Sequence, residues 1–342
     1  MDSIEPGDVT FVVCVESGAY ESMAVTMVAS LRAFGGRLAS APVLAITPRL
    51  GPGLARSTRR SFAELGVSHV RTWHLRRAWF NFYPKVWVLA DAERLATTKS
   101  VVYVDSDILF LGEPTELMLP AGAVVAGCPR DSGIVGSPGP DGPYESAWRR
   151  AGDAVGLVVD DLPWIEPHDG SARIRFYLNA GVVVVRRGAD VTRLWLGCTE
   201  EIFRHRVDFG VWREQFHEQV ALGLAIVRFR LPYRPLPWSH NYGIDSSFPD
   251  ALESDELARV SVLHYHDQLR PEHWEHTVDR LREVHPNVGE WLARQGPIVD
   301  PSSRLARLLR RWLAFVRHWL RRLYRLPDWL VRRRLGRRSV TD

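Results

Sequence analysis

The chain has 342 residues, enough to bury a large core as one α/β domain or as two lobes. With 46% hydrophobic and 25% charged residues, it has the composition of a soluble globular protein, which excludes a fibrous or low-complexity chain. Three widely spaced cysteines (Cys14, Cys128 and Cys198) predict reduced core residues, not a disulfide framework or a zinc site. Residues 1–8 lack the basic and apolar regions of a signal peptide, so we expect a cytoplasmic protein.

Charge is unevenly distributed along the chain. Residues 301–342 contain 13 arginines and two acids, a net charge of +11, which leaves −7 for the first 300 residues because the whole chain carries +4. A mildly acidic body with a strongly basic tail indicates an anionic partner for the tail.

Taken in chain order, apolar runs alternate with amphipathic segments, which predicts a mostly parallel sheet with helices on its faces. The predicted strands are 11–15, 42–47, 67–72, 101–104, 123–126, 177–186 and 260–266, and the predicted helices are 20–34, 54–65, 84–96, 190–206, 217–225, 274–285 and 287–295. Residues 129–173 are rich in Gly, Pro and Asp and are predicted to form one long, functional or mobile loop.

The most informative strand is 101–104, because it ends abruptly in Asp105-Ser106-Asp107. In an extended backbone residues i and i+2 project to the same side, so Asp105 and Asp107 aim at one point and Ser106 faces away. Two hard oxygen ligands suit Mg²⁺ or Mn²⁺, and such a metal suits a diphosphate. The carboxyl end of a strand is also where open α/β sheets bind ligands. Alone, this short motif fits a solvated turn equally well.

A second motif lies on the last predicted strand, which runs into His264-Tyr265-His266-Asp267-Gln268-Leu269-Arg270-Pro271. With the aspartate pair it resembles the glycogenin-like glycosyltransferases, a family that has the GT-A fold and includes bacterial lipopolysaccharide galactosyltransferases. The resemblance covers roughly residues 10–275. It implies that Asp105, Asp107 and His264 hold Mn²⁺ (or Mg²⁺) on the diphosphate of a nucleotide-sugar. His266 is expected on the opposite face of the strand and is left out of the metal site.

Two positions depart from the family pattern. Arg270 replaces a lysine that contacts the diphosphate, and Asp267 replaces a glycine. An arginine can still clamp a diphosphate, whereas the missing glycine changes the loop.

Further matches extend the resemblance to sugar and nucleotide. It implies catalytic roles for Asn179, Glu218 and Gln219, and donor-binding roles for Glu16, Tyr20, Lys85, Ser106, Ala180, Gly181 and Arg270. Two of them have a plainer alternative: Asn179 fits a turn residue with an Asx hydrogen bond, and Glu218 fits the solvated face of a helix. The family retains anomeric configuration, whereas inversion would need a carboxylate base such as Glu218 or Asp131 beside the acceptor.

The basic tail has a helical pattern over 302–326. At about 100° per residue its Leu, Val and Trp side chains fall within an arc of about 140°, with the arginines opposite. No apolar run approaches the ~20 residues that a membrane span needs. Trp312 and Trp319 on one face, with Arg311 and Arg322 on the other, predict that residues 302–338 lie on an anionic membrane surface. The alternative is a stripe that docks on the catalytic body or on a second subunit. Nucleic-acid binding is not expected, because it would leave the stripe unused.

These observations predict a catalytic domain in residues 1–300, with a nucleotide-binding half at 9–128 and an acceptor half at 129–300, followed by a membrane-association tail at 301–342. We expect a metal-dependent, retaining glycosyltransferase of the hexosyltransferase type on the cytoplasmic face of a membrane. It would transfer sugar from a UDP-linked donor to a lipid-linked or cell-envelope glycan; its oligomeric state is open. The rivals are a haloacid-dehalogenase-type phosphatase, a nucleotidyltransferase and a catalytically decayed membrane-tethered scaffold.

Overall fold

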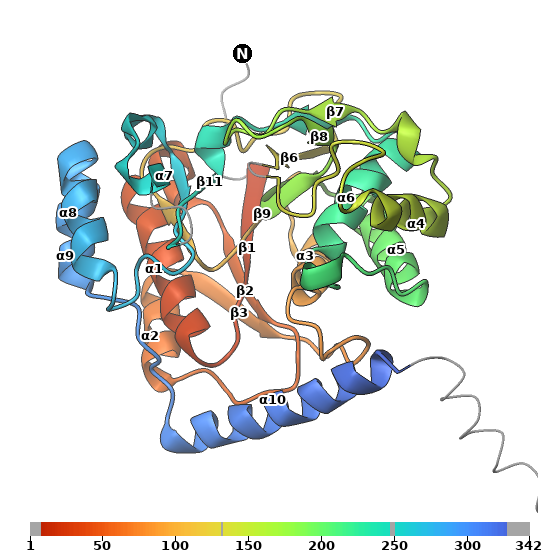
Figure 1. Ribbon diagram of the computed structural model, residues 1–342. Coiled ribbons are helices and arrows are strands. Elements are labelled where there is room, and N and C mark those ends of the chain that lie inside the picture. Colours follow the sequence, from red (N-terminus) through yellow and green to blue (C-terminus); the bar gives the residue numbers. More distant parts are fainter. Residues whose placement is uncertain (1–7, 131–132, 247–249, 327–342) are drawn as a thin grey trace, which may run out of the picture.

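The computed structural model describes residues 8–130, 133–246 and 250–326. Its centre is a seven-stranded sheet with the order β10-β6-β9-β4-β1-β2-β3 (Figure 1). The strands are β1 (Val9–Cys14), β2 (Val43–Thr47), β3 (Val67–Arg71), β4 (Ser100–Val104), β6 (Val125–Pro129), β9 (Leu178–Arg186) and β10 (Tyr233–Pro235). β9 runs antiparallel to its neighbours β4 and β6, and the other pairs are parallel. The predicted mixed, mostly parallel sheet is therefore confirmed.

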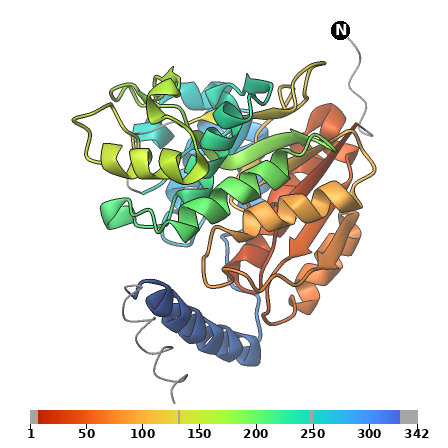
Figure 2. The ribbon, with the colours of Figure 1, turned by 90° about the vertical axis from the view of Figure 1, so that its right-hand side faces the viewer.

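Helices cover both faces of this sheet, as Figure 2 shows. The helices are α1 (Ala19–Phe34), α2 (Arg56–Glu64), α3 (Pro84–Leu95), α4 (Glu145–Val155), α5 (Val191–Arg204), α6 (His217–Arg228), α7 (Asp250–Glu253), α8 (Trp274–Val284), α9 (Pro286–Gln295) and α10 (Arg304–Tyr324). Along β4, Val101 and Tyr103 pack in the core shared with α3 to α6, whereas Val102 and Val104 pack in the core shared with α1 and α2. Burial on both faces explains why β4 is continuously apolar.

A smaller sheet fixes the position of the last motif. Its order is β11-β12-β5, formed by β5 (Ile108–Phe110), β11 (Tyr242–Gly243) and β12 (Val262–His264). β5 follows Asp107 directly and pairs antiparallel with β12, so that His264 lies opposite Ile108. This pairing brings two segments more than 150 residues apart to one point.

The prediction that residues 129–173 form one long loop is wrong, because this segment contains regular structure. It contains α4 and the short strand β7 (Trp164–Ile165), which pairs with β8 (Ile174–Arg175). α4 forms because Ala147, Trp148 and Ala151 make a buried stripe at helical spacing. The strand predicted at 260–266 is also too long, because β12 ends at His264.

The tail helix α10 lies along the lower edge of the body in the view of Figure 1. Ion pairs join Arg310 to Asp300 at one end, and Arg321 and Arg325 to Glu214 near the other. Most of its apolar side chains are exposed: Leu305, Leu308, Leu309, Trp312, Phe315, Trp319, Leu320 and Leu323. The alternative in which this stripe docks on the catalytic body is therefore wrong, because carboxylates on the body hold the opposite face.

None of the helices among the described residues is long and apolar enough to cross a membrane. The part of the predicted membrane segment beyond residue 326, and Asp131, lie outside the described residues.

Candidate active site

Asp105, Asp107 and His264 converge at the carboxyl end of β4. One ligand atom from each lies within 4.8 Å of the others, and His264 Nε2 is 3.4 Å from Asp107 Oδ1. Burial would raise the pKa of Asp107, but the neighbouring His264 holds it below the usual range, so the carboxylate is ionised. Two carboxylate oxygens and one imidazole nitrogen form a suitable donor set for Mn²⁺ or Mg²⁺.

Asn241, which the sequence analysis missed, orients the imidazole. Its Oδ1 lies 3.1 Å from His264 Nδ1. Since an amide oxygen only accepts, we assign the proton to Nδ1, which leaves the Nε2 lone pair facing the aspartates. A partner that fixes the tautomer in this way is typical of metal-binding histidines.

Gly181 makes room for this pair. A Cβ built on it would lie 2.7 Å from His264 Nδ1 and 2.9 Å from Asn241 Oδ1. The Asn179 side chain accepts a hydrogen bond from the Gly181 amide at 3.0 Å, which is the turn contact that its plainer interpretation predicts. The segment 179–181 therefore shapes the wall behind His264, and a contact of Asn179 with sugar stays a prediction.

His266 does not lie where it was expected. Its ring stacks on that of His264, with centroids 4.0 Å apart and an angle of 12° between the planes. Because β12 ends at His264 and His266 has a φ of +46°, strand alternation stops and the ring turns back toward the site. The expectation that it points away is wrong.

Lys85, on α3, connects the metal site to α6. Its Nζ donates to Asp105 Oδ2 at 3.0 Å and to the Ala180 carbonyl at 3.3 Å, and lies 4.0 Å from Glu218 Oε1. The other oxygen of Asp105 accepts a hydrogen bond from the Tyr103 hydroxyl at 2.6 Å. Burial would lower the pKa of Lys85, but Asp105 and Glu218 raise it, so the ammonium stays charged.

Glu218 is fully buried, so its interpretation as part of a solvated helix face is wrong. Neither carboxylate oxygen has a hydrogen-bond partner among the described residues, and burial raises its pKa to about 7. A buried carboxylate that lacks a hydrogen bond and has a raised pKa is a candidate functional group. The adjacent Gln219 accepts a hydrogen bond from Arg130 at 3.5 Å.

The remaining predicted residues lie around this centre. Ser106 faces away, with its Oγ 4.0 Å from Met23 Sδ. Glu16 is held by Arg49 through contacts of 2.6 and 2.5 Å, which lower its pKa although burial would raise it. Tyr20 is exposed on the first turn of α1. Arg270 is also exposed, and within the described part of the chain its side chain has no hydrogen-bond or ion-pair partner.

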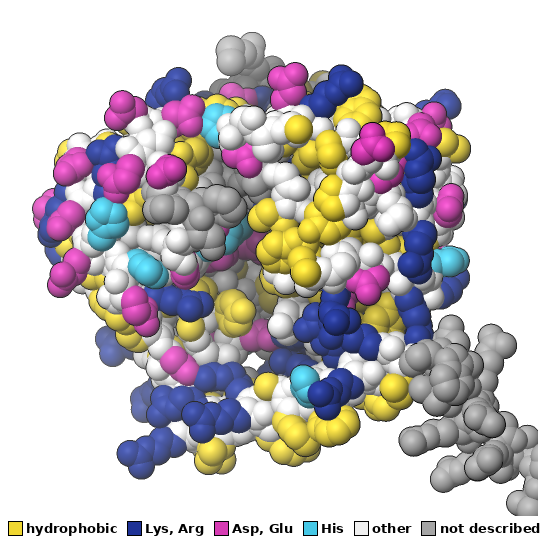
Figure 3. Space-filling model, in the orientation of Figure 1, with side chains coloured by type: hydrophobic (Ala, Val, Ile, Leu, Met, Phe, Trp, Pro, Cys, Tyr) yellow, Lys and Arg dark blue, Asp and Glu magenta, His cyan; other side chains and the backbone are white. Residues whose placement is uncertain are grey.

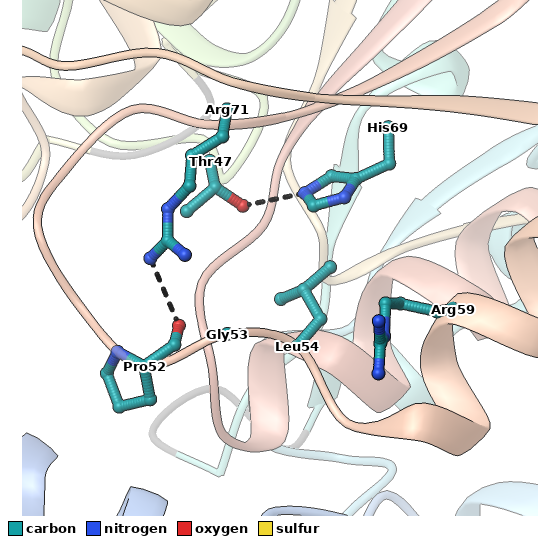
Figure 4. Close-up of a pocket in the computed structure, with 7 residues that line it drawn as sticks. All are labelled: Thr47, Pro52, Gly53, Leu54, Arg59, His69 and Arg71. Carbon is teal, nitrogen blue, oxygen red and sulfur yellow. Dashed lines mark hydrogen bonds between the residues drawn. The ribbon is translucent and has the colours of Figure 1, made fainter.

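A separate cavity of about 290 Å³ lies beside β2 and β3 (Figure 4). Three basic residues contribute to its wall: Arg59, His69 and Arg71. Arg71 donates a hydrogen bond to the Pro52 carbonyl, and His69 Nε2 forms a hydrogen bond with the Thr47 hydroxyl. None of the predicted site residues lines it.

The central sheet, with the candidate site at its carboxyl edge, has the arrangement of the GT-A fold. The chain belongs to the Rhodobacterales glycosyltransferase domain family, whose model matches residues 11–230. The resemblance stated from the motifs is thus confirmed at the level of the class, and the phosphatase and nucleotidyltransferase alternatives are excluded. No curated protein matches the sequence.

Several solved structures of glycosyltransferases are similar to this chain, and the first of them supports the fold. The apo structure of the bifunctional glycosyltransferase WbbM superposes with a TM-score of 0.52 at 12% identity, over 86% of this chain and 53% of WbbM. The chain therefore spans about half the length of WbbM. The structure of an active-site mutant of LgtC has a TM-score of 0.49 at 15% identity, over 80% of this chain and 96% of LgtC. The apo structure of mouse xyloside xylosyltransferase 1 has a TM-score of 0.43 at 14% identity, over 77% of this chain and 98% of the mouse chain.

Proposed function

We propose that this glycosyltransferase uses a divalent metal, Mn²⁺ or Mg²⁺, to bind a nucleotide-diphosphate sugar, with UDP as the nucleotide. The convergence of Asp105, Asp107 and His264 at the carboxyl edge of the sheet carries this proposal. Asn241 and Gly181 support it, because the tautomer of His264 and the space around its ring suit a metal ligand.

When bound, the metal would supply positive charge to the departing nucleotide diphosphate, where negative charge develops during transfer. The chain's own residues prepare this site. Tyr103 and Lys85 fix the Asp105 carboxylate from two sides, and Lys85 adds a buried positive charge beside it. Glu218 lies 4.0 Å from Lys85, and neither of its carboxylate oxygens has a hydrogen bond of normal geometry among the described residues, so it is the group that we expect to face the sugar.

Retention of anomeric configuration is supported by the family resemblance alone. The buried Glu218 is compatible with stabilising positive charge on the sugar, or with acting as a base toward an acceptor hydroxyl in an inverting reaction. NMR of the anomeric proton of the product would distinguish retention from inversion.

We further propose that α10 attaches the enzyme to the cytoplasmic face of an anionic membrane, where the acceptor is a lipid-linked or cell-envelope glycan. Figure 3 shows hydrophobic side chains along the outer edge of α10 with basic side chains beside them. An apolar face with Trp312 and Trp319, flanked by Arg311 and Arg322, has the pattern of an interfacial helix.

The donor proposal is tested by thermal stabilisation with UDP or GDP, each with and without Mn²⁺, in wild type and Asp107→Asn. We expect stabilisation by UDP that requires Mn²⁺ and is lost in the variant, because the variant removes one ligand charge without changing size. The same shift with GDP alone would change the nucleotide assignment. No shift with any nucleotide would contradict an active donor site and favour the decayed scaffold.

A further inference from the structure

The arginine face of α10 contacts the turn that follows β1, where the nucleoside of the donor is expected. Arg310 Nη1 lies 3.4 Å from Ser17 Oγ and 2.7 Å from Ser302 Oγ. A Cβ built on Gly18 would lie only 2.8 Å from Arg310 Nη1, so the helix is seated closely on this turn. Arg317 donates to the Leu50 carbonyl at 3.0 Å and thereby holds the turn after β2 as well.

A small cavity lies between the helix and these two turns. Its volume is about 30 Å³, and its wall includes Glu16, Ser17 and Arg49 from the body and Arg310, Leu313 and Arg317 from α10. Such a volume has room for only about one or two water molecules. A base therefore does not fit inside it, and α10 leaves the side chains of the Glu16–Arg49 pair only 19% and 6% exposed. Leu313, which is buried, is the apolar residue that α10 contributes to the wall of this cavity.

Tyr20 lies on the first turn of α1, directly after the turn that contains Glu16 and Ser17. The residue is 55% exposed, so that its aromatic ring could stack on a base. A nucleoside diphosphate with its phosphates at Asp105 and Asp107 would extend toward the turn after β1 if its nucleoside is bound by Glu16 and Tyr20.

We propose that α10 forms the nucleoside end of the donor site, with Arg310 and Arg317 as positioning residues that hold the turns at 16–20 and 48–52 in the form that binds the base and ribose of a nucleoside diphosphate. The inference rests on the proposed donor function. It assigns opposite tasks to the two faces of one helix: the arginine face shapes the donor site, and the exposed apolar face remains available to the membrane.

The test compares two ligands of the wild-type protein and of variants by calorimetry, in the presence of Mn²⁺ and without membranes. UDP reaches both the metal and the nucleoside end, whereas pyrophosphate reaches only the metal. We expect Arg317→Ala and Arg310→Gln each to weaken UDP binding about tenfold, the effect of losing one charged hydrogen bond, and to leave pyrophosphate binding unchanged. Asp300→Asn, which frees Arg310 without altering the cavity wall, should weaken UDP binding in the same way.

Arg304→Gln is the matched control, because it removes the same charge from the same helix at an exposed position and should leave both affinities unchanged. Equal UDP affinities in wild type and in the Arg310 and Arg317 variants would overturn the inference, as would an equal loss of UDP and pyrophosphate binding. Failure of the wild type to bind UDP or GDP at all would instead refute the proposed donor function.

Discussion

At the scale of single residues, the buried carboxylate of Glu218 lowers the stability of the folded chain when it is ionised, although we expect its charge to serve catalysis. A buried carboxylate with no hydrogen-bond partner among the described residues is costly to ionise, and its pKa of about 7 expresses that cost. Because the usual value is 4.5, the unfolded chain ionises first. The free energy of unfolding therefore falls as the pH rises from about 4.5 to about 7, by an amount on the order of 3 kcal/mol.

Glu218→Gln should consequently be more stable than wild type at pH 8 and lose most of that advantage at pH 4.5, where the carboxyl is protonated in the folded wild-type chain and half protonated in the unfolded one. Transfer activity should fall by about 10² or more, because the variant lacks the charge next to Lys85. Chemical denaturation at both pH values and a transfer assay check this. A stability difference that does not change with pH would show that Glu218 titrates normally.

The residues of the candidate site differ in how far the sequence reveals them. Asp105 and Asp107 are two apart after an apolar strand, so their shared direction follows from strand geometry alone. Asn241 and Arg49 carry no such pattern; they enter the site through contacts with residues 23 and 33 positions away. His266 was misplaced because its direction depends on a left-handed backbone beyond the end of β12, where strand alternation no longer applies.

At the scale of elements, the docking of α10 depends on carboxylates at both ends. Burial would raise the pKa of Glu214, but Arg325 and Arg321 lower it; Arg310 likewise lowers the pKa of Asp300 to about 2. A lowered carboxyl pKa means that docking gains stability above the usual carboxyl pKa and loses it as the pH falls through the lowered value. The ion pairs of Glu214 and Asp300 with α10 are thus fully formed at pH 7 and weaken only in acid.

Glu214→Gln should release the C-terminal part of α10 already at pH 7, because both of its arginine partners lose their counter-charge. Hydrogen exchange should become faster in residues 318–324 and remain slow near Arg310, whose partner Asp300 is intact. Exchange rates identical to wild type along the whole helix would mean that other contacts, such as the Tyr324 hydroxyl to the Phe203 carbonyl, hold this end.

Long periodic elements were predictable, and short ones were not. β1 and α1 have apolar patterns long enough to identify, and the structure places them within two residues of the prediction. β5 and β11 have three and two residues, and nothing local distinguishes them from a loop. They exist because β12 pairs with them from more than 15 residues away in sequence, and such pairing is not visible in a local pattern.

At the scale of the whole molecule, charge is separated between the body and α10, and the apolar side of the helix has no cover among the described residues. Deletion of residues 302–342 should abolish sedimentation with vesicles that contain anionic phosphatidylglycerol. Neutral phosphatidylcholine vesicles should bind the full chain much more weakly, since each basic residue near an anionic surface contributes about 1 kcal/mol.

Trp312→Ser with Trp319→Ser should weaken vesicle binding without the deletion, because these side chains supply much of the exposed apolar area. A truncated chain that still sediments with anionic vesicles would contradict the role of the tail. If the full chain instead forms dimers that the two tryptophan substitutions dissociate, the stripe is a subunit interface.

The docking of α10 also has a consequence for how the chain folds. The helix contacts Ser17, Leu50, Phe203 and Glu214, which precede it by between 107 and 293 residues. During vectorial synthesis all of these partners emerge earlier, and domains fold as their segments appear. The apolar stripe therefore becomes available only when a folded surface already exists to receive the arginines opposite it. The catalytic body can therefore fold before the exposed apolar face of α10 is synthesised.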